Sequence, residues 1–148
     1  VPFEFIDKAM AVIALCPRHT FQVLTKRPER MAEYFAQERD WALHLGNVAY
    51  EMFGDEDADC FVTNSINGLL GESDGVKRNV GWPMKNLWLG TSVENQQEAD
   101  RRIPHLLDTP AAIRFLSCEP LLGPVELSNL SGWETRAAVK WLGKPTLT

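Results

Sequence analysis

The sequence predicts an α/β fold with about three parallel strands and outer helices, arranged as in part of a (β/α) barrel. Three short apolar runs each end in small hydroxyl residues and charges, within residues 21–28, 86–95 and 113–120. Helical patterns separate these runs. A strand, a helix and a strand within about 30 residues favour parallel strands joined by a right-handed crossover.

The composition is that of an ordinary globular protein. The chain has 148 residues, of which 45% are apolar and 24% are charged. A net charge of −5 argues against broad non-specific binding to nucleic acid but leaves room for a local basic site. No apolar run has the length of a membrane span, and the three cysteines are too scattered for a disulfide framework. We therefore expect a cytoplasmic protein with no membrane partner.

A single domain is expected over residues 1–148. The chain opens on Val1 and Pro2 directly before a helical pattern, and its last residues form no closing element. These ends suggest a piece of a longer barrel.

The first half of the chain predicts a helix, a strand and a long helical region. An apolar stripe at helical spacing runs through residues 4–16, and Pro17 ends it. Residues 21–24 form the first strand. A helix is expected to begin at Pro28, because proline needs no amide donor in the first turn. Its pattern continues past residue 41, weakens at Gly46 and resumes before Gly54.

Residues 55–85 predict an irregular insertion or lid. Glycine, aspartate, asparagine and serine are frequent there, and a short helix is expected only around residues 64–70. Such a long connection is either functional or a tolerated surface insertion, and the sequence does not separate the two.

The second half predicts a strand–helix–strand unit. The strand at residues 87–89 is expected to deliver Thr91, Ser92 and Glu94 into a loop. Asn95 suits the N-cap of the next helix, with a kink or restart at Pro104. The second strand covers residues 113–116, an extended loop follows, and residues 133–142 predict a last short helix.

Several familiar motifs are absent. There is no glycine-rich dinucleotide fingerprint and no P-loop. No cysteines have metal-ligand spacing, so no metal site is predicted. The histidines at positions 19, 44 and 105 are interpreted as ordinary surface or capping residues.

The strand ends hold the candidate site, because ligands of α/β folds bind beyond the carboxyl ends of the strands. Lys26 and Arg27 suit a carboxylate or a phosphate of a substrate. Glu94 and Glu119 are the catalytic candidates, because carboxylates bind amino or ribose groups or act in acid–base chemistry. Hydroxyls that could bind a cofactor come from Ser92 and Ser117. The alternative is that these charges only solvate the rim and pair with one another.

Three segments, residues 20–31, 86–96 and 114–124, resemble a phage- and prophage-associated family of unknown function. Its members resemble radical-SAM enzymes with a three-cysteine motif and a partial (β/α) barrel. The resemblance implies S-adenosylmethionine and a [4Fe–4S] cluster as cofactors of full-length relatives. By resemblance and charge, Glu94 and Glu119 are expected to contact the methionine amine, the ribose or the substrate, in a cofactor site that Ser92 and Ser117 also line. Lys26 and Arg27 are expected to hold a carboxylate or phosphate, and these two cations alone favour a nucleotide or nucleic-acid substrate.

The same resemblance makes this chain the central part of such a barrel. The cysteines at positions 16, 60 and 118 do not match the cluster motif, so the chain alone is expected to be inactive as a radical enzyme. Its expected partners are the missing N- and C-terminal parts of the same barrel. Open strand edges also favour self-association. A non-catalytic phage accessory binding protein and a hydrolase using Glu94 and Glu119 remain the alternatives.

Overall fold

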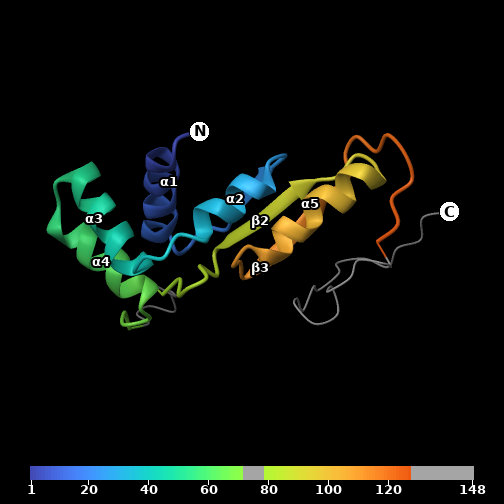
Figure 1. Cartoon of the computed structure of the whole chain (residues 1–148). Coiled ribbons are helices and arrows are strands. Elements are labelled where there is room, and N and C mark those ends of the chain that lie inside the picture. Colours follow the sequence, from blue (N-terminus) through green and yellow to red (C-terminus); the bar gives the residue numbers. More distant parts are fainter. Residues whose placement is uncertain (72–78, 128–148) are drawn as a thin grey trace.

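The computed structural model describes residues 1–71 and 79–127. Within these ranges the chain is an α/β protein with a parallel three-stranded sheet (Figure 1), which confirms the predicted fold class. The elements are α1 (Phe3–Leu15), β1 (Phe21–Thr25), α2 (Pro28–Phe35), α3 (Trp41–Phe53), α4 (Glu56–Ile66), β2 (Leu87–Ser92), α5 (Gln96–Asp108) and β3 (Ile113–Ser117). No helix in the described part of the chain is long and apolar enough to cross a membrane.

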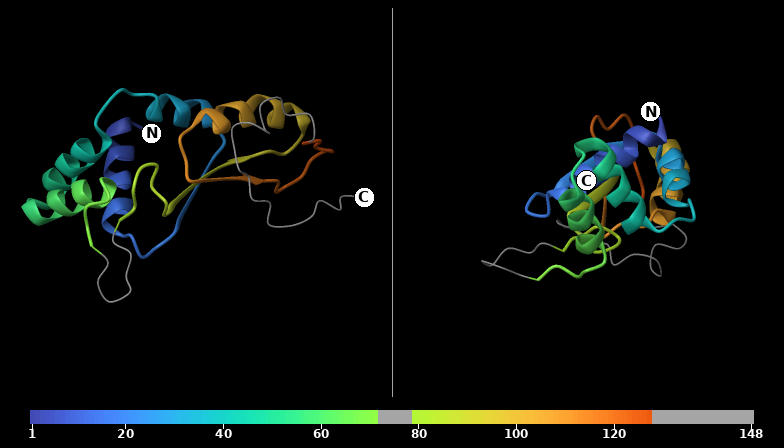
Figure 2. Two further views of the ribbon diagram at one scale, coloured as in Figure 1. Left: turned by 90° about the horizontal axis from the view of Figure 1, so that it is seen from below. Right: turned by 90° about the vertical axis from the view of Figure 1, so that its left-hand side faces the viewer.

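The central strand of the sheet is β2, with β1 and β3 parallel to it on either side. Helices α2 and α5 lie along one side of the sheet (Figure 2). Leu87 and Leu89 belong to the core formed with these helices and with α1, α3 and α4. Because side chains alternate along a strand, Gly90 and Ser92 point to the opposite face.

The helix that begins at Pro28 ends earlier than the sequence predicts. It stops at Phe35, and a separate helix begins after Asp40, whose side chain accepts a hydrogen bond from the Leu43 amide at 3.0 Å. The break between the two helices therefore lies before Trp41, and the expected weakening at Gly46 was wrong. Aspartate is a strong N-cap because its carboxylate accepts an otherwise unpaired amide of the first turn.

Gly46 is a packing position inside α3. A Cβ atom there would lie 2.2 Å from Asp59 Oδ1 and 2.2 Å from Thr63 Oγ1 of α4. The missing side chain thus allows α3 and α4 to approach closely.

The expectation of an irregular segment over residues 55–85 was wrong for its first part. Asp55 caps α4 by accepting a hydrogen bond from the Asp57 amide at 2.9 Å, and Val62 and Ile66 bury the helix against the core. Residues 79–86 lead into β2, whereas residues 72–78 lie outside the described part of the chain. The predicted helix around 64–70 overlaps only the end of α4.

The two later strands extend further than predicted. Thr91 pairs in register with Thr25, and Ser92 pairs with Ser117, so both residues belong to β2 rather than to a loop. The capping role of Asn95 is confirmed, because its side chain accepts a hydrogen bond from the Glu98 amide at 3.0 Å. Helix α5 then continues through Pro104 without a restart. The predicted helix at 133–142 lies outside the described residues.

The close contact at Gly46 predicts the effect of a substitution. Gly46→Ala should destabilise the fold by about 1–3 kcal/mol, because the new methyl group forces α3 and α4 apart. Urea unfolding followed by circular dichroism measures this change. Gly71→Ala is the matched control, since nothing lies within 4 Å of a Cβ atom at that position. Equal unfolding midpoints for both variants would contradict the packing role.

Candidate functional site

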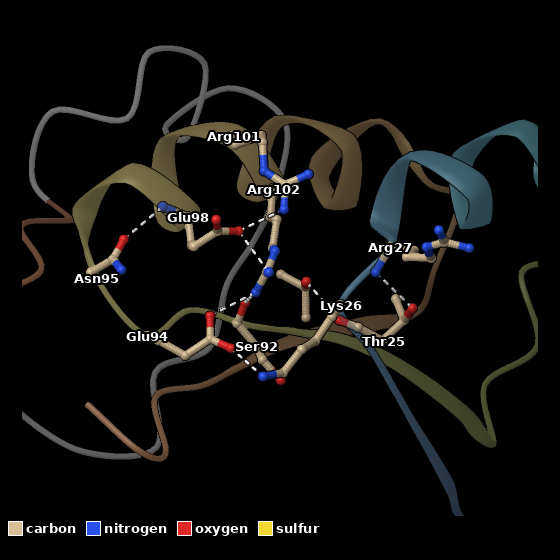
Figure 3. A network of polar contacts seen from close by, with 10 residues as sticks. Thr25, Lys26, Arg27, Ser92, Glu94, Asn95, Glu98, Arg101 and Arg102 are labelled. Carbon is tan, nitrogen blue, oxygen red and sulfur yellow. Dashed lines mark hydrogen bonds and ion pairs between the residues drawn. The ribbon is translucent and has the colours of Figure 1, made fainter. Parts of the chain in front are cut away.

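The register of the sheet brings the predicted residues to one edge. Ser92 and Ser117 end neighbouring strands as a pair in register, and Lys26 follows directly after β1. Figure 3 shows the Lys26 and Glu94 side chains pointing toward one another. The grouping predicted from the strand ends is therefore present for Lys26, Ser92 and Glu94.

Glu94 is a buried carboxylate held from two sides. One oxygen, Oε1, forms an ion pair with Lys26 Nζ, and the other, Oε2, lies 2.7 Å from Arg102 Nη1. The Glu94 side chain is only 9% exposed, whereas the Lys26 side chain is 62% exposed. The lysine is thus the solvent-facing partner, and the arginine is the interior one.

Arg102 of α5 links the strand end to the helix. Its Nη1 also donates a hydrogen bond to the Ser92 carbonyl at 2.7 Å, and its Nη2 lies 2.6 Å from Glu98 Oε2. Arg101 contacts the same glutamate oxygen at 2.6 Å. The resulting chain of contacts contains three cations and two carboxylates, which leaves one excess positive charge at this edge.

The sequence-based site did not include Arg102. Two signals for it are present in the sequence. Glu98 precedes Arg102 by four residues, which is the favourable spacing and order for a helical ion pair. Arg102 also lies on the buried stripe of α5 together with Ala99 and Ile103, where an arginine needs a partner.

These contacts keep Glu94 ionised. The hydrogen bond from Lys26 holds the pKa of the Glu94 carboxyl below its ordinary value of 4.5, and Arg102 acts in the same direction against the effect of burial. A general acid at neutral pH needs a raised pKa. This environment therefore suits Glu94 for binding a cation rather than for donating a proton.

The remaining candidates lie nearer to solvent. Arg27 is exposed, and its guanidinium makes no ion pair within residues 1–71 and 79–127. Only its backbone amide is engaged, by the Thr25 hydroxyl at 3.0 Å. Glu119 is also exposed, and with Ser117 it lines a pocket at the end of β3. Glu119 thus faces a different environment from Glu94, although both follow strand ends.

The described residues do not fit an iron–sulfur cluster. Cys16 follows α1, Cys60 is an exposed residue of α4, and Cys118 follows β3. Across residues 1–71 and 79–127, no three histidine, cysteine or acidic side chains are placed to share a metal ion.

A second polar cluster joins α1 to α2 and α3. The Tyr34 hydroxyl donates a hydrogen bond to Asp7 Oδ1 at 2.7 Å, and His44 Nε2 lies 3.0 Å from the same oxygen. Burial, followed by the contact with Asp7, raises the pKa of Tyr34. His44 is half-exposed, and its contact with an aspartate of another helix was not predicted from the sequence.

The position of Arg102 predicts an unequal effect of two neighbouring substitutions. Arg102→Met should lower the urea midpoint clearly, because it leaves the buried Glu94 carboxylate without its interior partner. Arg101→Met is the matched control and should leave the midpoint nearly unchanged, since Arg101 is half exposed and its ion pair with Glu98 lies on the helix surface. A similar loss in both variants would contradict the special role of Arg102.

The lowered pKa of Glu94 predicts a pH dependence. The folded-state pKa lies below the unfolded-state value, so the ionised carboxylate stabilises the fold above about pH 4.5. This contribution is lost as the pH falls through the folded-state pKa. Unfolding of the wild type and of Glu94→Gln, compared from neutral to strongly acidic pH, should show a difference that disappears in acid. If the stability difference between the wild type and Glu94→Gln instead grew in acid, the pKa of Glu94 would be raised by folding rather than lowered.

Comparison with known proteins places the chain in a family without assigning it an activity. Residues 1–142 match the family described as "Protein of unknown function (DUF5131)". Searches of the curated proteins and of the solved structures returned no match. The expected membership of a family of unknown function is confirmed, whereas neither a phage origin nor a radical-SAM relationship follows from this match. Because the match covers almost the whole chain and all three strand ends, the chain belongs to the DUF5131 family of proteins of unknown function.

Proposed function

We propose that the carboxyl edge of the sheet binds a small ligand carrying both an ammonium and a carboxylate group, S-adenosylmethionine, within a larger radical-SAM-like barrel. The observation that carries this proposal is the ion pair between Lys26 and Glu94 at two neighbouring strand ends. A lysine ammonium and a glutamate carboxylate held side by side are complementary in charge to the carboxylate and the ammonium of an amino-acid head group.

The two partners differ in how easily they separate. Lys26 is mostly exposed, so its ammonium group can turn from Glu94 to a ligand carboxylate at little cost. Glu94 keeps its charge when Lys26 leaves, because Arg102 still contacts its other oxygen. The ligand ammonium then takes the place of Lys26 at Oε1. Arg27, which makes no ion pair among the described residues, lines a groove beside α1 and α2 instead.

The other strand ends supply groups for the rest of the ligand. Ser92 and Ser117 pair in register at two of the strand ends, and their hydroxyls are of the type that binds the ribose hydroxyls of S-adenosylmethionine. When bound beside an iron–sulfur cluster, S-adenosylmethionine supplies radical chemistry. The described cysteines do not fit that cluster, so the contribution of this chain is to bind and orient the ligand. The missing parts of the barrel are the proposed source of the cluster.

A substrate with a phosphate, such as a nucleotide, would use the same cations, Lys26 and Arg27. A binding protein without catalysis would need the same contacts and differs only in lacking cleavage of S-adenosylmethionine. The hydrolase alternative is less favoured, since Glu94 is held ionised and Glu119 lines a separate pocket.

Binding measurements test the proposal directly. Isothermal titration calorimetry with S-adenosylmethionine should show binding that weakens roughly tenfold in Lys26→Ala and in Glu94→Gln, since each variant loses a charged contact with the ligand head group. Lys85→Ala is the matched control, because Lys85 is an exposed lysine just before the opposite end of β2. No binding by the wild type, or equal loss in the control, would refute the proposal.

The open edge of β1 supports the proposed partners. Val23 and Leu24 of this edge strand are 40% and 49% exposed, and the backbone of an edge strand is a template for pairing with another chain. We propose that the missing part of the barrel covers them, and that the chain alone self-associates through this edge.

Light scattering over a range of concentrations tests this second proposal. The wild-type chain should show a mass that rises with concentration, and Leu24→Lys should reduce the rise because a charge at an edge strand opposes pairing. Leu43→Lys is a control at an exposed leucine of α3. A monomer at all concentrations would contradict self-association.

A further inference from the structure

A pocket of about 550 Å³ lies at the end of β3, beside the segment 121–127 that follows it. Its walls are mainly apolar, and its polar side chains belong to strand-end residues. The lining residues are Phe115, Leu116, Ser117, Cys118, Glu119, Leu121, Val125 and Leu127. This volume lies within the range of about 300–1,000 Å³ that is typical of small-molecule sites.

The aromatic wall of the pocket depends on a glycine in the neighbouring strand. Phe115 and Gly90 are partners in register, and a Cβ atom on Gly90 would lie 2.5–2.7 Å from the tip of the Phe115 ring. The ring therefore occupies the space that any side chain at position 90 would fill. It remains half-buried, so part of its surface faces the pocket.

The opposite wall is tied to the edge that carries Glu94. The Leu122 amide donates a hydrogen bond to the Glu94 carbonyl at 2.7 Å, and the Glu126 amide donates one to Gln96 Oε1 at 2.6 Å. Val125 and Leu127 also pack against the apolar cluster between β2 and α5. Figure 2 shows this segment returning past the end of the sheet near the start of α5. The wall is thus preformed.

We infer that this pocket binds a flat heteroaromatic ring carrying an amino group, that is, a nucleobase. A planar ring can stack on Phe115 and fill the apolar walls. The Ser117 hydroxyl and the Glu119 carboxylate at the rim accept hydrogen bonds from an exocyclic amino group. The carboxylate also disfavours an anionic group in the pocket, so phosphates remain with Lys26 and Arg27.

This inference deepens the proposed function, since the pocket opens at the strand end next to Ser92 and Glu94. The nucleobase site rests on the proposed function only for where the amino-acid head group of the ligand lies. Adenosine has the ring but lacks the amino-acid head group, so its binding tests the pocket separately from the ion pair at Lys26.

The first test changes the aromatic wall. Gly90→Ala should weaken adenosine binding at least tenfold in calorimetry, because the added methyl group forces the Phe115 ring away from β2. The matched control is Gly123→Ala, where a Cβ atom would lie no closer than 3.9 Å to its nearest neighbour. Urea unfolding of both variants shows whether each is folded. A folded Gly90→Ala variant with unchanged affinity would overturn the inference.

A variant of the exposed Glu119 tests how the pocket recognises an amino group, and it leaves the buried core unchanged. Adenosine should bind more tightly than inosine, which has a carbonyl in place of the amino group. Glu119→Gln should reduce this preference several-fold, whereas Glu51→Gln, a change at an exposed glutamate of α3, should not. Equal binding of the two nucleosides by the wild type would show that the rim does not recognise an amino group.

Cys118 provides a readout inside the pocket. In a Cys16→Ser/Cys60→Ser variant, adenosine should slow the alkylation of Cys118, and methionine should not. Burial raises the pKa of this thiol, so the reaction is followed at alkaline pH. Protection by hexanol equal to that by adenosine would overturn the preference for a ring. Adenosine protection without any effect of Lys26→Ala on S-adenosylmethionine binding would refute the proposed function alone.

Discussion

The ion pair between Glu94 and Arg102 connects the two parts of the molecule on which the site depends. It joins the end of the central strand to α5, and the same guanidinium group reaches the Ser92 carbonyl and Glu98. A buried carboxylate is tolerated only with such partners. The ion pair with Arg102 therefore holds the Glu94 carboxylate in place at the carboxyl edge of the sheet. Lys26, which is exposed to solvent, is the partner of Glu94 that a ligand can displace.

Two glycines set how closely neighbouring elements pack, in separate parts of the molecule (Figure 1). Gly90 makes room for Phe115 on the sheet, and Gly46 lets α3 and α4 pack closely. In both cases the glycine is needed because a Cβ atom at its position would overlap a neighbouring side chain. The site and the pocket lie close together for a different reason: Ser92 and Ser117 pair in register, and the segment after β3 returns to the Glu94 backbone.

Local patterns predicted much of the architecture. The three strands, the proline that begins α2 and the cap at Asn95 follow from short-range preferences, and they were confirmed. The helix α4 was missed because its acidic first turn resembles a loop, although Asp55 caps it. The continuation of β2 through Ser92 was missed because polar residues were assigned to a loop, whereas pairing with Ser117 keeps them in the sheet.

By itself, the sequence determined the α/β class, the parallel order of the strand ends and the membership of Lys26, Ser92 and Glu94 in one edge. These features depend on spacing along the chain. Only the tertiary structure decided that Lys26 and Arg102 keep Glu94 ionised, that Glu119 belongs to a separate pocket and that His44 meets Asp7. Each of these depends on side chains from different elements meeting in space, and the energy of a buried charge is set by such partners rather than by its neighbours in sequence.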